Sequence, residues 1–245
     1  MSKTIMIASG KGGTGKSMIS VNLGLALQNS GHSTIVVDMD FCMRTLDLYL
    51  GAQNRALFDM GDVINGTCCI DKALIDFPDL SGLRLMPASQ AMRDADIVPE
   101  SVEKVIEELN GSAEYIILDC APGICRMNAL CMDAADYVIL VVTPDYASIR
   151  DAEAVEDKLL RNGVFGRSYI VNKIMPYLVE KKCEPDYREI DERLKCGMLG
   201  MILYDDNIRA STNIGVPIVA KKDTYITQNF ERISERLIAK LSVDE

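Results

Sequence analysis

The chain has 245 residues and a formal net charge of −10, and 48% of its residues are hydrophobic. Its negative charge makes broad DNA binding unlikely, because the chain would repel phosphates unless basic residues gathered locally. No apolar run reaches the 18 residues typical of a membrane-spanning helix, and the N-terminal residues lack the apolar core and cleavage site of a signal peptide. We therefore expect a cytoplasmic protein.

Short apolar runs, predicted to be strands, alternate along the chain with segments of helical periodicity. The runs are rich in Ile, Val, Leu and Tyr without polar alternation, which is typical of strands buried on both faces of a mostly parallel sheet. This order predicts a doubly wound α/β fold with helices on both faces. No linker rich in Gly, Pro or Ser interrupts it, so we expect one domain over residues 1–245. The expected strands are Thr4–Ala8, Thr34–Val37, Leu83–Met86, Tyr115–Leu118, Tyr137–Val142, Tyr169–Val171 and Met198–Leu203, and the expected helices are Gly15–Asn29, Pro99–Leu109, Ala147–Leu160 and Pro185–Leu194.

A glycine-rich loop follows the first predicted strand and opens the first predicted helix. Its glycines let the backbone close around a phosphate, and successive N–H groups at a helix N-terminus attract the anion. Lys16 should reach the β- and γ-phosphates, and the Ser17 hydroxyl should bind magnesium. The sequence predicts a nucleotide site that extends to Met18. The loop fits GxxxxGK[ST] as Gly10-Lys11-Gly12-Gly13-Thr14-Gly15-Lys16-Ser17.

The second predicted strand leads into Asp38 and Asp40, within "IVVDMD". Ligands bind beyond the carboxyl ends of strands in open parallel sheets. Two carboxylates near a triphosphate would repel it unless magnesium lies between them or one orients an attacking water. The alternative interpretation is that these residues cap a turn at the end of the strand.

A further buried run, "YIIL", precedes Asp119. A hydrophobic strand that ends in Asp is the Walker-B pattern, whose carboxylate holds magnesium directly or through water. Ala121-Pro122-Gly123 then forms a turn that could approach the γ-phosphate and change conformation when that phosphate leaves. An ordinary strand-end turn is the alternative, but the four apolar residues favour the magnesium role.

The last predicted helix, about Thr224 to Leu241, carries one apolar stripe. The stripe could dock on the sheet or lie on a membrane. Because the charges of the helix are mixed and the chain ends in "SVDE", docking on the core is favoured. The stripe consists of Ile226, Phe230, Ile233, Leu237 and Leu241.

Together these segments resemble the MinD/ParA family of deviant-Walker ATPases, along essentially the whole chain. "KGGTGKS" matches the family's signature loop, including its additional lysine, Lys11. "VVDMDFCMRTLDLYLG", "LRLMPASQAMRDAD" and "LYDDNIRASTNIGVPIV" are similar to segments of the MinD branch, which also includes flagellar-number regulators. One difference is Tyr204, which stands where the MinD loop commonly has proline.

The resemblance implies an ATPase with slow basal, partner-stimulated hydrolysis that binds ATP and Mg²⁺ and forms a homodimer with two nucleotides at the interface. Lys11 would cross to the partner's phosphates, and Asp40 would position the hydrolytic water. Asp38 and Asp119 would lie around magnesium, with Ser17 as a ligand. Adenine would be contacted by Asn172, Leu203 and Asp205. The expected task is placement of the cell-division site or related spatial positioning.

The resemblance also defines what this chain is expected to lack and which other tasks compete. MinD proteins usually carry a basic amphipathic extension after the last core helix, but this chain stops at Glu245. We therefore expect no strong intrinsic membrane anchor, with the inner face of the cell membrane reached through a partner. A flagellar-number regulator is one alternative. Another is a metallocentre-maturation ATPase that uses Cys120, Cys125 or Cys131 at its interface.

Two further protein classes, and a metal site formed by cysteines of a single chain, are less favoured by the sequence. A ligase similar to dethiobiotin synthetase would generally lack the signature lysine, and a non-catalytic adaptor would not need the intact phosphate loop and carboxylates. The chain has eight cysteines, but no CxxC or CxC pair, so a metal site within one chain has weak support. We expect most of these thiols to be reduced and buried.

Overall fold

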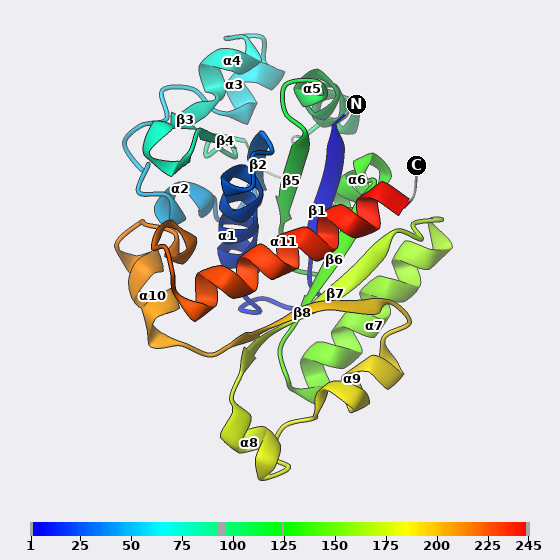
Figure 1. Cartoon of the computed structure of the whole chain (residues 1–245). Coiled ribbons are helices and arrows are strands. Elements are labelled where there is room, and N and C mark those ends of the chain that lie inside the picture. The colour runs from blue at the N-terminus through cyan, green and yellow to red at the C-terminus, as the bar shows by residue number, and fades with distance from the viewer. Residues whose placement is uncertain (1, 93–96, 124, 244–245) are drawn as a thin grey trace.

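A computed structural model describes residues 2–92, 97–123 and 125–243. Residues 93–96, at the end of the "LRLMPASQAMRDAD" segment, lie outside the described residues. The strands form one sheet of eight in the order β3-β4-β2-β5-β1-β6-β7-β8 (Figure 1). Neighbours pair in parallel except β3 and β4, which are antiparallel. The strands are β1 Lys3–Ala8, β2 Thr34–Met39, β3 Ile75–Phe77, β4 Leu83–Met86, β5 Tyr115–Cys120, β6 Tyr137–Val142, β7 Arg167–Ile174 and β8 Gly197–Leu203.

Helices cover both faces of this sheet, as the alternation of apolar runs and amphipathic segments predicts. On one face α1 packs against β2, β5 and α11, and on the other face α6 packs against β1, β5 and α5. Helix α7 packs against β6 (Figure 1). The helices are α1 Lys16–Asn29, α2 Leu46–Tyr49, α3 Met60–Ile64, α4 Ile70–Ala73, α5 Pro99–Leu109, α6 Arg126–Ala134, α7 Tyr146–Arg161, α8 Pro176–Glu180, α9 Tyr187–Arg193, α10 Asp206–Asn213 and α11 Tyr225–Val243.

The central strands supply side chains to two separate hydrophobic clusters, one on each face. In β1, Met6 and Ala8 belong to one cluster, whereas Ile5 and Ile7 belong to the other. Successive side chains of a strand point to opposite faces, so a strand covered on both sides has to be apolar throughout. This is why β1 shows no alternation of polar and apolar residues, and it confirms the predicted doubly wound class.

Helix α11 belongs to the core. The predicted stripe, from Ile226 to Leu241, is between 0% and 5% exposed, and α11 packs against α1 and β8. The stripe is therefore used for docking on the sheet face rather than for contact with lipid. Among the helices in the described ranges, none combines the length and apolarity that crossing a membrane would need.

The structure also contains short elements that the sequence patterns did not indicate. These are the edge strand β3 and the helices α2, α3, α4, α6, α8 and α10. Most span too few residues for a helical period to be recognised. The predicted helix at Pro185–Leu194 is shorter, because Asp186 caps it and helical structure runs only from Tyr187 to Arg193. Strands β2 and β5 reach further than expected, so Asp38 and Asp119 lie within them.

The contact between β8 and α11 gives a test of packing. A Cβ added at Gly200 would lie 2.5 Å from Cγ1 of Ile233, whereas one added at Gly197 would meet only the Lys240 ammonium, at 3.8 Å. Because overpacking a core costs about 1–3 kcal/mol, Gly200→Ala should lower the free energy of unfolding by that amount in urea titrations. Gly197→Ala, in the same strand, should change it by less than about 0.5 kcal/mol. Equal effects of the two substitutions would contradict the close packing inferred here.

Candidate functional site

The glycine-rich loop joins β1 to α1 at the carboxyl end of the sheet. Gly13 and Gly15 have φ angles of 78° and 98°, in the left-handed region that favours glycine. A Cβ at Gly10 would lie 2.4 Å from backbone and side-chain atoms of Asp151 in α7, and one at Gly15 would lie 2.2 Å from Nδ2 of Asn172. These glycines are therefore required by backbone conformation and by the close approach of neighbouring elements.

Two neighbouring segments hold the loop through its backbone. The Nδ2 amide of Asn172, at the end of β7, donates to the carbonyl of Thr14 at 2.7 Å, and Nζ of Lys173 donates to the carbonyl of Gly13 at 2.7 Å. The backbone N–H of Gly123, in the turn after β5, donates to the carbonyl of Ser9 at 2.9 Å. The loop is thus shaped before any ligand enters.

Lys16 is largely buried at the start of α1, with its Nζ 2.9 Å from Oγ of Ser9. Burial lowers the pKa of Lys16, and the nearby Asp119 carboxylate opposes that shift. A buried ammonium is stabilised by an anion close to it. The environment of Lys16 therefore suits a phosphate group.

Two carboxylates lie side by side at the ends of adjacent strands. Asp38 of β2 and Asp119 of β5 are register partners, and both are almost completely buried. Burial, and then repulsion from Asp119, raises the pKa of Asp38 to about 7. Burial also raises the pKa of Asp119 to about 6, although hydrogen bonds with Ser17 and Ser20 oppose the shift. A divalent cation would relieve the cost of burying two like charges so close together.

Asp38 also shapes the loop that follows β2. Its Oδ1 accepts the N–H of Asp40 at 3.0 Å, and its Oδ2 accepts those of Thr45 and Leu46 at 2.9 and 3.0 Å. Asp40 in turn accepts the N–H groups of two residues after it, Cys42 and Met43, through Oδ1. The capping role considered for these residues is therefore present, and it places Asp40 at the wall of the site.

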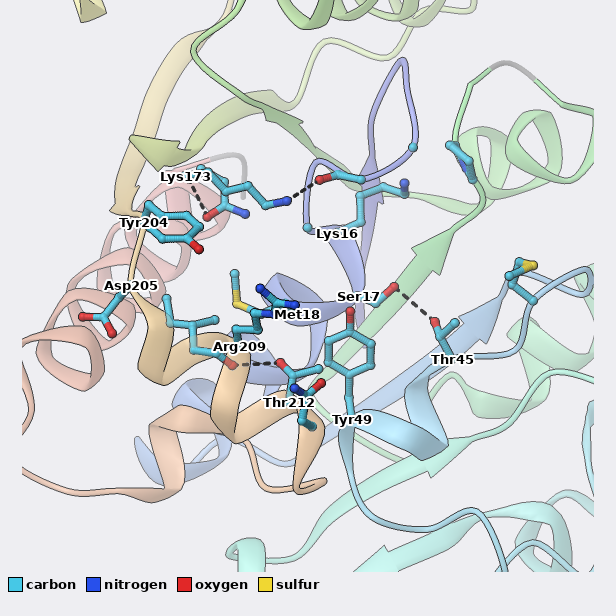
Figure 2. A pocket seen from close by; sticks show the side chains of 18 of the residues that line it. Lys16, Ser17, Met18, Thr45, Tyr49, Lys173, Tyr204, Asp205, Arg209 and Thr212 are labelled. Carbon is cyan, nitrogen blue, oxygen red and sulfur yellow. Dashed lines mark hydrogen bonds between the residues drawn. The ribbon is translucent and has the colours of Figure 1, made fainter. Parts of the chain in front are cut away.

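A cavity of about 690 Å³ opens in front of these groups (Figure 2). Ten of the predicted site residues line it, whereas Gly10, Lys11, Thr14, Asp38 and Asp119 are not among its lining residues. The ten are Gly12, Gly13, Gly15, Lys16, Ser17, Met18, Asp40, Asn172, Leu203 and Asp205.

Other residues of the lining were not singled out from the sequence, although all but Lys173 lie in segments that resemble the MinD branch. They come mainly from the loop after β2, from α2 and from α10, two short helices that the sequence pattern did not reveal. These residues are Met43, Thr45, Tyr49, Lys173, Ile208, Arg209, Thr212 and Asn213. For Lys173, adjacency to Asn172 was the only available signal.

Lys11 is not among the residues that line the cavity. Its Nζ lies 2.9 Å from both carboxylate oxygens of Asp145, the residue that caps α7. Burial favours a raised pKa at Asp145, but hydrogen bonds from Thr143, Lys11 and Ser148 outweigh it and lower the pKa. The two lysines of the loop therefore have different surroundings: one is buried under the loop, and the other is partly exposed at its edge.

The cysteines near this site are mostly buried. Cys120 and Cys131 are at most 2% exposed and interact with each other, and burial raises the pKa of the Cys120 thiol. Cys125 occupies the N-cap position of α6, without a side-chain capping bond, and is partly buried. Within the part of the chain that the structure describes, His, Cys, Asp and Glu side chains form no group of three or more suited to a metal ion.

The residues present fit a nucleotide with magnesium. The Oγ1 atom of Thr14 is buried without a hydrogen-bond partner in the described ranges, and the space beside Gly13 is open. Lys16 and the loop N–H groups can hold phosphates. The Ser17 hydroxyl, which accepts a hydrogen bond from Thr45 Oγ1 at 3.3 Å, and the carboxylate pair supply the oxygen ligands that magnesium prefers.

The bond from Asn172 to the loop can be tested against a matched amide. Asn172→Ala leaves the Thr14 carbonyl without its side-chain donor, so we expect unfolding to require about 1–3 kcal/mol less, faster amide exchange at residues 13–16 and weaker Mg-ADP binding. Asn229 makes a similar bond, to the Met201 carbonyl at 2.7 Å, on exposed surface. Asn229→Ala should leave exchange in the loop and nucleotide affinity unchanged. Calorimetry and hydrogen exchange measure both variants, and unchanged loop exchange in Asn172→Ala would refute the anchoring role.

Comparisons with known proteins show which family the chain belongs to. A family model described as an AAA domain matches residues 2–159. The septum site-determining protein MinD of Bacillus subtilis is 33% identical over 244 residues, which cover 98% of this chain and 90% of that protein. A putative septum site-determining protein MinD of Oltmannsiellopsis viridis is 34% identical over 240 residues, covering 97% and 76%.

Solved structures lead to the same family. The chain in the MinC:MinD cell division protein complex of Aquifex aeolicus is 32% identical, with a TM-score of 0.89 and coverage of 97% of this chain and 96% of that one. The Pyrococcus horikoshii septum site-determining protein MinD, complexed with Mg-ADP, has a TM-score of 0.87 and covers 100% of this chain and 99% of that one. At 24% identity it supports the fold alone. From its phosphate loop, its sheet and these similarities, the chain belongs to the MinD/ParA family of deviant-Walker P-loop ATPases.

Proposed function

We propose that this protein is an ATP-driven switch of the MinD type that dimerises on ATP and takes part in placing the division site. The observation that carries the proposal is the pair of lysines in the phosphate loop. Lys16 lies under the loop, beside Ser9, whereas Lys11 lies at its edge against Asp145. One lysine suits its own nucleotide, and the other suits a nucleotide held by a second copy.

The position of Lys11 supports a role in trans. Its side chain is 34% exposed, and of the two loop lysines only Lys16 is among the described residues that line the cavity. Phosphoryl transfer spreads negative charge over the γ-phosphate oxygens, and an additional cation there lowers the barrier. A lysine that reaches this charge only across a dimer interface would make hydrolysis depend on dimerisation.

The other roles follow the layout of the site. We assign Lys16 to the phosphates and Ser17, with Asp119 and Asp38 near it, to magnesium, which supplies charge neutralisation when bound. Asp40 lies at the cavity wall and is assigned to positioning the attacking water. Asn172, Leu203 and Asp205 are assigned to the adenine end, which is supported by their place in the cavity lining.

The partner and location are inferred from the relatives. The Aquifex aeolicus relative was solved in a MinC:MinD complex, and the Pyrococcus horikoshii one with Mg-ADP. We propose that this chain likewise uses ATP and Mg²⁺ and has a regulatory protein partner. In this proposal basal hydrolysis is slow, the partner stimulates it, and the protein reaches the membrane from the cytoplasm through a partner.

Substituting the two loop lysines should separate binding from dimerisation. Lys16→Ala should abolish nucleotide binding. Lys11→Ala should keep Mg-ADP affinity within about threefold but lose ATP-dependent dimerisation and about 10³-fold in stimulated hydrolysis, the scale of an arginine finger. Light scattering with ATP and phosphate release measure these effects. Lys195→Ala removes a comparable exposed pair, with Asp157 at 2.6 Å, and should behave like the native protein. ATP-dependent dimers of Lys11→Ala with normal hydrolysis would exclude the role in trans.

Asp40 offers a trap for the partner. Asp40→Ala should bind ATP and dimerise but hydrolyse ATP about 10²-fold more slowly or worse, as expected when a water-positioning group is lost. Asp40→Asn keeps one oxygen that can accept the turn N–H groups. Equal slowing in both variants would therefore show that the loss of hydrolysis comes from the missing carboxylate and not from a disturbed loop. Normal hydrolysis by either variant would reject the assignment.

The same trapped dimer tests the biological task. Proteins that co-purify with Asp40→Ala in ATP, but not in ADP, should include a division inhibitor or a topological-specificity factor. Exclusive recovery of a flagellar regulator or of a metalloenzyme precursor would overturn placement of the division site and favour one of the two alternative tasks.

A further inference from the structure

Part of the cavity wall is formed by two short helices that do not belong to the nucleotide motifs. Tyr49 ends α2, and Arg209 and Thr212 lie on α10, which packs against α2. We call these three residues the α2–α10 wall. Figure 2 shows the Tyr49 and Arg209 side chains rising from this wall toward the start of α1, where Ser17 and Met18 lie.

Arg209 is the cation of the α2–α10 wall. The other cations of the cavity lining have partners: Lys16 donates to Ser9 and Lys173 donates to Gly13. Arg209 makes no hydrogen bond or ion pair with any residue that the structure describes. A guanidinium that faces a cavity in this way suits an anion, and its planar donors match phosphate oxygens in particular.

Tyr49 supplies a neutral donor beside this charge. Its side chain is partly buried and packs against the hydrophobic cluster on the α1 face, while its hydroxyl points toward Ser17 (Figure 2). Burial, and then the Asp119 carboxylate, raises the pKa of Tyr49. The hydroxyl therefore keeps its proton at neutral pH and can donate a hydrogen bond.

The first turn of α1 offers free backbone N–H groups but no side-chain donor at its third residue. Lys16 and Ser17 serve the phosphates held by the loop, but the next residue, Met18, has a thioether that donates no hydrogen bond. The adenine end of the cavity is marked by Asn172, Leu203 and Asp205. A nucleotide that runs from the loop to this end has to pass Met18 with the wall opposite, which places its α-phosphate where the helix offers no side-chain donor.

We infer that Arg209, together with the hydroxyl of Tyr49, binds the α-phosphate of the nucleotide. This inference rests on the proposed function, because it requires a nucleoside diphosphate or triphosphate in the cavity. It adds two binding residues from outside the phosphate loop, and through them it links α2 and α10 to the presence of nucleotide.

Calorimetry with Mg-ADP and Mg-ATP on the full chain tests this assignment. Arg209→Met keeps an unbranched side chain of similar helix propensity and removes its charge. It should weaken binding of both nucleotides equally, by about tenfold or more, the loss expected for one charge-assisted hydrogen bond. Arg209→Lys should recover part of the affinity, and Tyr49→Phe should cost about threefold while the ring stays packed. Arg232→Met, on the exposed side of α11, is the matched control and should bind normally.

The outcomes separate this inference from the broader proposal. Native affinity for Mg-ADP in Arg209→Met would overturn the inference, and so would a loss confined to Mg-ATP, which would place Arg209 at the γ-phosphate or at a dimer interface. Failure of the unsubstituted protein to bind Mg-ADP would instead overturn the proposed function. If Arg209→Met destabilises the fold, seen as an altered urea midpoint, Tyr49→Phe provides a second measurement of the same phosphate contact. Unchanged nucleotide affinity in Tyr49→Phe would show that the Tyr49 hydroxyl does not bind the α-phosphate.

Discussion

The parallel register between β2 and β5 is the constraint on which the rest of the site depends. It places Asp38 and Asp119 directly opposite each other in a dry sheet, where burial and mutual repulsion make two negative charges costly. The surrounding groups reduce this cost: backbone N–H groups bond to Asp38, and Ser20 bonds to Asp119 at 2.8 Å. The same bonds fix the loop after β2, so the arrangement of the carboxylates also determines where α2 begins.

The phosphate loop depends on neighbours that lie far from it in the sequence. Its carbonyls are held by Asn172 and Lys173 from β7 and by Gly123 from the turn after β5. Gly10 also packs so closely against the backbone of Asp151 in α7 that no side chain would fit there. Such a loop has little freedom to lose when a phosphate binds, which favours affinity. Displacement of the turn at Gly123 would break its hydrogen bond to Ser9 and so alter the phosphate loop directly.

Much of the architecture was predictable because its signals are local. The central strands are continuous apolar runs, and the loop motif fixes the start of α1 by its spacing. The apolar pattern does not reveal the α2–α10 wall, since α2 has four residues and none of the residues of α10 is buried. The segments that contain the two helices carry the family resemblance, but the resemblance does not say which of their side chains line the cavity. Nor does it reveal that Asn172 holds the loop, or that Lys11 meets Asp145, because both contacts join residues more than 130 positions apart.

The pair between Lys11 and Asp145 has a consequence for how readily the loop changes partners. The two side chains are 34% and 45% exposed, and ion pairs exposed to this degree contribute at most about 1 kcal/mol and weaken as salt rises. Asp145 can therefore keep the ammonium oriented without holding it strongly. A phosphate that competes for Lys11 therefore has to offset only the small free energy of the Lys11–Asp145 ion pair. This free energy decreases as the ionic strength rises.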